Sequence, residues 1–205
     1  MVVEVLEEDC YESSRLDEAT APERVHELDC PILVTERLVL RPPHSEDVDA
    51  IAYLANNPRV ANMLARMPHP YTRENAVDFV ERSRKGKMGN CIYAITQADS
   101  GLFMGCCGIH PWGEDLEIGY WLGEPYWGNG YATEASDALI DLAFRATAID
   151  RLQISCRVIN ASSRRVIDKS GFQFSSEGVG DILSVGKVPV ERYVLDRSTW
   201  IGLRS

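Results

Sequence analysis

Hydrophobic and polar positions repeat along this chain with two different periods, which separate predicted helices from predicted strands. Apolar residues at positions 48, 51, 52 and 55 follow the i, i+3, i+4, i+7 spacing of an amphipathic helix that Ser45 can cap. Thr72 is a second N-cap candidate, before a helix that ends at Gly86 and Gly89. The same period predicts two later helices, over residues 133–146 and 161–170.

Strand-like segments occupy most of the remaining chain after residue 35. Turn residues at 99–101 and 111–113 separate three consecutive strands, which indicates an antiparallel meander. Strands then alternate with the two later helices, an order typical of a mixed α/β or α+β sheet. The predicted strands are 36–41, 91–96, 102–110, 116–122, 151–158, 172–179 and 190–195.

Charge divides the chain near residue 34. The 205 residues have a net charge of −10, and the first 34 hold ten acidic residues against two arginines, a net charge of −8. We therefore expect an acidic N-terminal extension, 1–34, followed by one domain, 35–205, with the apolar residues 28 and 32–34 buried at the boundary. The domain has no excess of Lys and Arg, so nucleic-acid binding through a broad basic surface is not expected.

Other compositional features point to a cytoplasmic protein without a metal. No apolar run is long enough for a membrane span, and the acidic start does not resemble a secretory signal. The six cysteines form no C-x-x-C pair and no cluster at zinc spacing, so we expect them to be reduced. They are Cys10, Cys30, Cys91, Cys106, Cys107 and Cys156.

The segment with the clearest chemistry is the turn between strand 116–122 and helix 133–146. Gly128 and Gly130 allow backbone amides to converge there, and the start of a helix favours an anion such as a phosphate. A P-loop is excluded, because Gly130 is not followed by Lys and Ser/Thr. A dinucleotide fingerprint also fits poorly, because Thr133 replaces its last small residue and the next strand ends without an acid.

The motif Trp-Gly-Asn-Gly-Tyr-Ala at 127–132 resembles the acyl-CoA pyrophosphate loop of the GNAT N-acetyltransferase superfamily, Arg/Gln-x-x-Gly-x-Gly/Ala. Trp127 departs from that pattern, as in the Rim-type branch of ribosomal-protein N-terminal acetyltransferases. Segments 35–41, 117–122, 132–135 and 160–172 are similar to the same branch, so the resemblance covers about residues 35–196. It implies an α/β (α+β) GNAT fold, in which a β-bulge splits a mixed, mostly antiparallel sheet flanked by helices.

The resemblance also implies where acetyl-CoA, the cosubstrate, binds. Asn160 would contact the CoA arm, and Arg165 or Arg164 would reach the 3′-phosphate unless both are simply solvated. The pantetheine arm would pair with free backbone groups of a splayed strand, and the pyrophosphate would bind loop amides. The strand residues are Tyr120, Trp121 and Leu122, and the loop residues are Gly128, Asn129, Gly130, Tyr131, Ala132 and Thr133.

For the transfer itself, the resemblance implies direct attack of a neutral amine on the thioester. Glu117 is the predicted base, acting through water, with an exposed strand carboxylate or a structural ion pair as the alternative and His110 as a secondary candidate. Many family members have a tyrosine as general acid where Ile167 stands here. Ser163 is the predicted substitute, with helix capping as its alternative role.

The expected function is acetylation of a primary amine, in particular a protein or peptide N-terminal α-amine. A small-molecule amine and a non-catalytic acyl-CoA sensor are the alternatives, and a nicotinamide oxidoreductase is a third. Segments 57–71 and 187–189 are expected to shape the acceptor pocket. The expected partners are acetyl-CoA and the acceptor, with neither nucleic acid nor membrane, and relatives are commonly homodimers.

Overall fold

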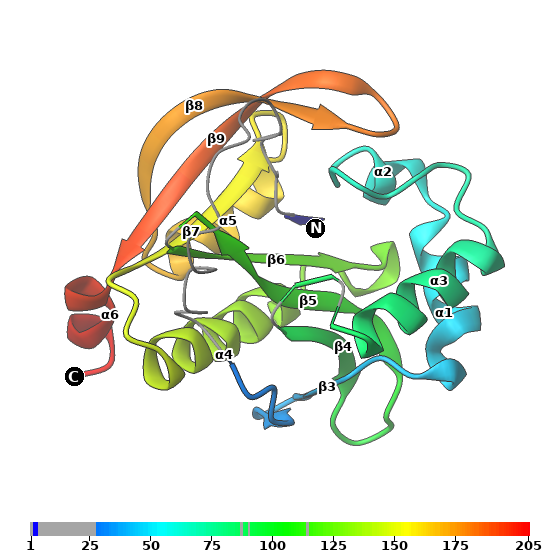
Figure 1. Ribbon diagram of the computed structural model, residues 1–205, viewed down its shortest axis with the longest axis horizontal. Helices are drawn as coiled ribbons and strands as arrows, with labels where there is room; N and C mark the ends of the chain where they lie inside the picture. Colours follow the sequence, from blue (N-terminus) through cyan, green and yellow to red (C-terminus); the bar gives the residue numbers. More distant parts are fainter. Residues whose placement is uncertain (1, 4–27, 87, 90, 114) are drawn as a thin grey trace, which may run out of the picture.

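One twisted sheet organises the molecule (Figure 1). The computed structural model describes residues 2–3 and 28–205, apart from 87, 90 and 114. Nine strands of this described part form the sheet in the order β2-β3-β4-β5-β6-β7-β9-β8, with β1 also pairing with β6. Among the described strand pairs, only β6–β7 is parallel. The strands are β1 Val2–Val3, β2 Leu33–Val34, β3 Leu38–Arg41, β4 Cys91–Gln97, β5 Phe103–Trp112, β6 Asp115–Leu122, β7 Arg151–Arg157, β8 Gln173–Ile182 and β9 Gly186–Asp196.

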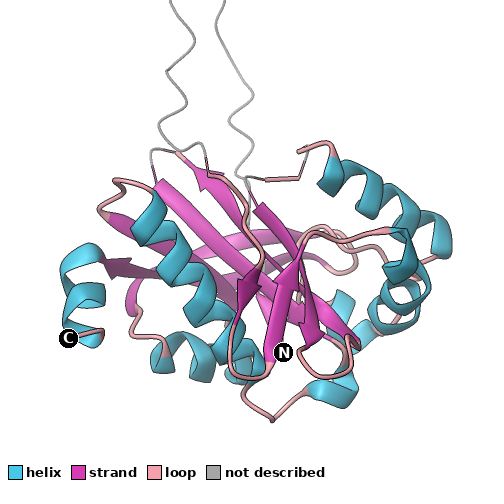
Figure 2. Ribbon diagram, turned by 90° about the horizontal axis from the view of Figure 1, so that it is seen from below, coloured by secondary structure: helices cyan, strands magenta, loops and turns pink. Residues whose placement is uncertain are grey.

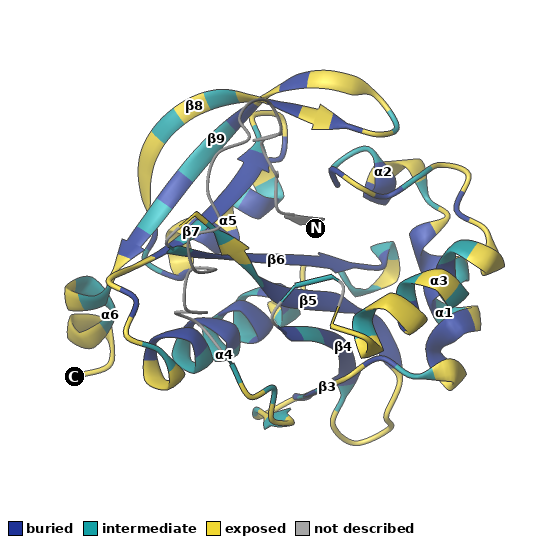
Figure 3. Cartoon of the chain, in the orientation of Figure 1, coloured by how far each residue is buried: buried dark blue, intermediate teal, exposed yellow. Residues whose placement is uncertain are grey.

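Helices flank the sheet in two groups, as Figure 2 shows. One face packs on α4 and α5 around a core that includes Ile118, Leu139 and Phe144. The other face packs on α1, α2 and α3, with Ile51 and Trp121 in a second core. Figure 3 shows that the central strands are buried on both faces. The helices are α1 Val48–Ala55, α2 Pro58–Ala61, α3 Arg73–Arg84, α4 Tyr131–Ala146, α5 Ala161–Lys169 and α6 Arg197–Leu203, with 3₁₀ turns at Ser45–Asp47 and Glu124–Tyr126.

The predicted order of strands and helices is confirmed, with shifts at the ends of several elements. Thr72 caps α3, because its hydroxyl accepts a hydrogen bond from the Asn75 amide. The helix predicted after Ser45 instead begins as a 3₁₀ turn with His44 as its cap. The sequence patterns did not indicate β1, β2, α2 or α6. None of the described helices is long and apolar enough to cross a membrane.

The cysteines correct one expectation. Cys30 and Cys91 form a disulfide that ties the segment before β2 to the start of β4, so the reduced state predicted for them is wrong. Cys106, Cys107 and Cys156 are free and buried, as expected. Cys10 lies outside the described residues.

The segment before β2 is also less buried than expected. Leu28 and Leu33 pack against the core as predicted. Ile32 and Val34 are 61% and 73% exposed, so their predicted burial is wrong. The reason is that β2 is an edge strand, paired only with β3 in the described sheet.

A buried ion pair fixes the connection from β3 to α1. The Arg41 guanidinium makes two 2.8 Å hydrogen bonds to the Asp47 carboxylate, and the His44 amide donates a third bond to it. Burial alone would raise the pKa of Asp47, but these hydrogen bonds and the Arg41 charge together lower it below its usual value. Asp47 therefore stabilises the fold while it is ionised.

We expect Asp47→Asn to lower the free energy of unfolding by about 3 kcal/mol at pH 7, because Arg41 loses its buried partner. A lowered folded-state pKa contributes stability above the unfolded-state pKa, and this stability is lost as the pH falls through the folded-state value. Urea unfolding should therefore show that the difference in the free energy of unfolding between Asp47→Asn and wild type becomes smaller as the pH falls into the acid range. Asp49→Asn, which breaks an exposed pair with Arg73, is the control and should leave stability unchanged. If Asp47→Asn lowers the free energy of unfolding by the same amount at every pH, the stabilising role of the ionised Asp47 carboxylate is contradicted.

Candidate functional site

The sheet opens between β6 and β7. The two strands pair only at Leu116↔Leu152 and Glu117↔Gln153. β7 pairs with β9 along its whole length and diverges from β6. The predicted split is therefore present. On its other side β6 keeps one register with β5, from Trp112↔Asp115 to Gly105↔Leu122. Divergence of β7 alone opens the sheet.

Glu117 lies at the point where the split begins. It is fully buried, and its Oε1 accepts a 2.7 Å hydrogen bond from Ser155 Oγ on β7. Because side chains alternate along a strand, Glu117 shares a face with Trp121, which packs toward α1–α3. His110, the secondary candidate, is its register partner on β5. The predicted base and the secondary candidate therefore lie opposite each other on neighbouring strands.

The opposite face of the split carries a second polar pair. Tyr120 Oη and Ser163 Oγ are 3.0 Å apart, and both residues are buried. Burial raises the pKa of the Tyr120 phenol well above its usual value, so the phenol is protonated. The Ser163 amide donates to Asn160 Oδ1 at 3.1 Å, which makes Asn160 the cap of α5. The capping role considered for Ser163 is therefore wrong, while its hydroxyl faces the tyrosine.

The glycine turn and the start of α4 form a cradle for an anion. Gly128 and Gly130 have φ values of +78° and +82°, which L side chains rarely adopt. Gly130 is the N-cap of α4 and provides no side-chain hydrogen bond to its amides. The first amides of a helix have no intrahelical acceptor, so this end favours a phosphate or pyrophosphate.

Two residues of the turn between β2 and β3, Thr35 and Arg37, hold this loop in place. Glu134 accepts hydrogen bonds from Thr35 Oγ1 at 2.6 Å and from the Arg37 amide at 2.8 Å, and its carboxylate pairs with the Arg37 guanidinium at 2.7 Å. Arg37 also donates to the Asn129 carbonyl oxygen at 3.0 Å. Burial raises the pKa of Glu134, but its bonds to Thr35 and Arg37 outweigh burial and lower it. The loop is therefore preformed.

Arg37 is a site residue that sequence reasoning missed. The segment 35–41 matched a family block, but nothing in its pattern indicated a contact with residue 134. Trp127, which replaces the usual Arg/Gln, also has a structural role that the sequence did not reveal. Its indole Nε1 donates to the Leu122 carbonyl oxygen at 2.7 Å and so ties the loop to the end of β6.

The backbone of β6 beyond the split differs from the prediction. Tyr120 and Trp121 pair with Val3 and Val2 of β1, and the Leu122 carbonyl is bound by Trp127. The prediction that these backbone groups are free is therefore wrong in this structure, because a strand of the same chain fills the edge.

The two arginines of α5 have different surroundings. Arg164 forms an ion pair with Glu191 at 2.8 Å and donates to the Val158 carbonyl at 2.8 Å. Arg165 is exposed and donates to Ser162 Oγ at 3.2 Å. Arg165 is therefore the better placed of the two for a phosphate arriving from solvent.

The two segments expected to shape an acceptor pocket meet above the split. The tip of the β8–β9 hairpin bonds to the segment after α2, where the Leu183 amide donates to the Ala65 carbonyl oxygen at 2.8 Å. Ala65, Ile182 and Val188 share a small apolar cluster at this contact. In Figure 1 the hairpin reaches over to α2 and arches above β6. Segments 57–71 and 187–189 therefore lie on the same side of the sheet as one another.

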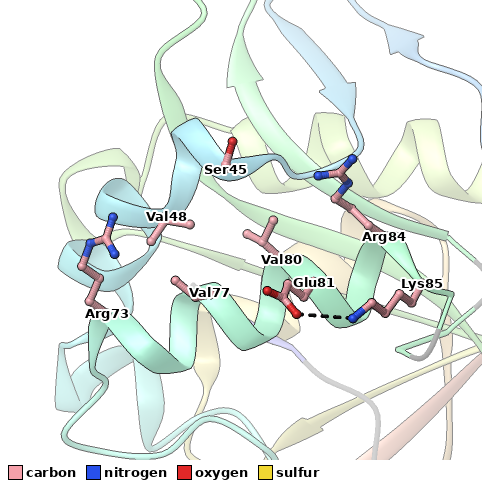
Figure 4. Close-up of a pocket in the computed structure, with 8 residues that line it drawn as sticks. All are labelled: Ser45, Val48, Arg73, Val77, Val80, Glu81, Arg84 and Lys85. Atoms are coloured by element: carbon pink, nitrogen blue, oxygen red, sulfur yellow. Dashed lines mark hydrogen bonds and ion pairs between the residues drawn. The ribbon is translucent and has the colours of Figure 1, made fainter.

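Two concavities lie at other places. A cavity of about 490 Å³ lies between α1 and α3 (Figure 4), lined by Val48, Val77 and Val80 and by charged side chains that include Glu81 and Lys85. A wider groove of about 1070 Å³ runs along the outer side of α4 and reaches Gly130 and Thr133. This groove is the only one of the two that touches the glycine turn.

A mixed sheet that opens between two parallel strands, beside an uncapped helix start with a glycine turn, defines the GNAT fold. The comparison with known families agrees, because residues 37–173 match the model of the acetyltransferase (GNAT) domain. The chain belongs to the GNAT acetyltransferase family.

The chain is also similar to individual proteins. The chain is 30% identical to the protein YkkB of Bacillus subtilis over 148 residues, 70% of this chain and 86% of YkkB. It is 39% identical to the ribosomal-protein-serine acetyltransferase of Escherichia coli over 64 residues, 31% of this chain and 36% of that protein. Among solved structures, the Microcin C7 self-immunity acetyltransferase MccE in complex with acetyl-CoA and AMP aligns with a TM-score of 0.68 at 22% identity, covering 79% of this chain and 93% of MccE.

Proposed function

We propose that this GNAT acetyltransferase moves the acetyl group of acetyl-CoA to the α-amine of a protein or peptide N-terminus. The observation that carries the proposal is the arrangement at the split, where Glu117 lies on one face of the sheet and Ser163 on the other. A carboxylate and a hydroxyl on opposite faces suit an acceptor and a thioester that approach from opposite sides. The partial match to a ribosomal-protein-serine acetyltransferase supports a protein N-terminus as acceptor.

The chain's residues fit acetyl-CoA at the glycine turn. The amides of residues 128–133 would hold the pyrophosphate, because this helix start has no side-chain cap and its turn is braced by Arg37 and Glu134. Asn160, at the start of α5, would contact the CoA arm, and Arg165 would meet the 3′-phosphate. The similar solved structure of MccE, which is in complex with acetyl-CoA and AMP, supports acetyl-CoA as the cosubstrate.

Acetyl-CoA supplies a thioester whose acyl carbon accepts a nucleophile. Glu117 would take the proton of the incoming ammonium group through water, while Ser155 orients its carboxylate. Deprotonating a lysine side chain at pH 7 costs roughly 4.6 kcal/mol, whereas an α-amine costs only about 1 to 1.4 kcal/mol. A single buried carboxylate is therefore better suited to an N-terminal α-amine than to lysine.

Ser163 would donate a proton to the departing thiolate. Its hydroxyl lies 3.0 Å from the Tyr120 phenol, which is protonated and can in turn donate to Ser163. This pair occupies the role that a tyrosine at position 167 has in many relatives, while Ile167 is fully buried here. Tyr120 acts through Ser163 and is a positioning residue.

We expect Tyr120→Phe to lower kcat about fivefold with little change in KM, because one hydrogen bond that orients Ser163 is lost. Thioesters with a more acidic leaving thiol should show a smaller loss, an effect that a purely structural role would not produce. Tyr193→Phe is the matched control, since Tyr193 is also buried and its phenol donates to Glu191 at 2.8 Å, whereas the Tyr120 phenol lies beside Ser163. Equal losses for all thioesters would contradict the role of Tyr120.

The proposed function is tested by measuring CoA thiol release from acetyl-CoA with peptide N-termini, free lysine and small amines. Peptide N-termini should be the best acceptors. Turnover with small amines alone would replace the proposal by a small-molecule acetyltransferase. Calorimetric binding of acetyl-CoA without thiol release from any acceptor would favour an acyl-CoA sensor.

A further inference from the structure

The edge of β6 beyond Glu117 holds two residues from the start of the chain. β1 pairs antiparallel with it, in the register Val2↔Trp121 and Val3↔Tyr120. In Figure 1 this short dark blue strand lies beside β6, below the arch of the β8–β9 hairpin. β1 also lies against β7 and α5, so it fills the split itself.

Without β1 this edge would be open. β7 leaves β6 after Glu117↔Gln153 and pairs with β9 along its whole length. The other edge of β6 is already paired with β5. An edge with unpaired N–H and C=O groups binds any extended chain that carries amides, and the pantetheine arm of CoA is such a chain.

β1 and pantetheine therefore need the same backbone groups. The family resemblance implies that pantetheine pairs with the backbone of Tyr120 and Trp121, which are the two residues that β1 covers. β1 also lies near α5, whose Asn160 and Ser163 are the proposed neighbours of the CoA arm and the thioester. Two chains cannot occupy one strand edge at the same time.

We propose that β1 is an intramolecular competitor of acetyl-CoA. Pairing of Val2 and Val3 with β6 closes the split, and acetyl-CoA binds after β1 has left the edge. This inference rests on the proposed function, because it uses the proposed position of pantetheine. It assigns the start of the chain a regulatory role, in which any partner or ligand that holds β1 away from β6 would increase the affinity for acetyl-CoA.

The test compares the full chain with two double variants. Val2→Pro with Val3→Pro removes both amide donors of β1 and keeps the chain length. Val2→Ala with Val3→Ala also shortens both side chains but keeps the donors. The dissociation constant of acetyl-CoA is measured by calorimetry for all three proteins. Hydrogen exchange of a peptide spanning 119–122 is measured without ligand.

The proline variant should bind acetyl-CoA roughly tenfold more tightly than wild type. Loss of one or two backbone hydrogen bonds shifts the equilibrium between paired and released β1 by about 5- to 30-fold toward the released state. Its 119–122 peptide should exchange faster, whereas the alanine variant should resemble wild type in both measurements. Equal dissociation constants in wild type and the proline variant would overturn the competition and leave the proposed function intact. Absence of acetyl-CoA binding in all three proteins would overturn both.

Discussion

Replacing Glu117 by Gln should lower kcat/KM for a peptide N-terminus by about 10²- to 10⁴-fold, the usual contribution of a general base. The amide is close to isosteric with the carboxylate and can still accept the hydrogen bond from Ser155, so the thermal midpoint should change little. Acetyl-CoA affinity, measured by calorimetry, should also stay near wild type. The loss would then lie in the transfer step, where the amine has to give up a proton.

The amine's own pKa provides the readout that separates a base from a structural carboxylate. An acceptor with a low amine pKa is already neutral at pH 7, so it depends less on Glu117. The loss of kcat/KM caused by Glu117→Gln should therefore be largest for lysine, smaller for an α-amine and smallest for an electron-poor amine. A deficit of the same size for all three acceptors would mean that Glu117 is structural.

Ser155→Ala is the matched control for Glu117. It removes the hydrogen bond to the carboxylate but leaves the carboxylate in place. A loss of only about 3- to 10-fold is expected, because orientation alone is affected. A loss as large as that of Glu117→Gln would place the essential group on β7 instead of β6.

The sequence could predict those parts of the fold in which local pattern and local structure coincide. The helix capped by Thr72 and the glycine turn at 128–130 are examples, because a cap and a positive φ each leave a residue preference at a single position. The position of Glu117 on the central strand was also predictable from the local sequence pattern, because the strand and the turns around it are both visible there. Its burial and its partner Ser155 on β7 were not.

Pairings between distant segments left no such local pattern. The Arg37–Glu134 brace joins residues 97 positions apart, and the Cys30–Cys91 disulfide joins residues 61 positions apart. The pairing of β1 with β6 depends on where β7 leaves the sheet, which is a property of the whole fold. The expectation that Tyr120 and Trp121 are free was wrong for this reason, because it considered β6 without the chain that could cover it.

The second large effect is expected at the glycine turn. Gly128 has a φ of +78° and nothing within 4 Å of the position that a Cβ would take. Gly128→Val therefore meets no clash, and its strain is purely conformational, because β-branched residues rarely adopt this region. Relief of that strain would rotate the amides that the proposed function assigns to the pyrophosphate. Loss of one charge-assisted hydrogen bond costs about 1.5 to 3 kcal/mol, so the dissociation constant of acetyl-CoA should rise about 10- to 100-fold.

Gly101→Val separates the loss of affinity from the loss of stability. Gly101, in the turn between β4 and β5, has a φ of +70° and is equally open. Both substitutions should lower the thermal midpoint by similar amounts, since each strains one residue in the left-handed region. Only Gly128→Val should weaken acetyl-CoA binding, because only its amides lie at the start of α4. Equal affinities in the two variants would remove the pyrophosphate from this turn and place the anion-binding site on another part of the fold.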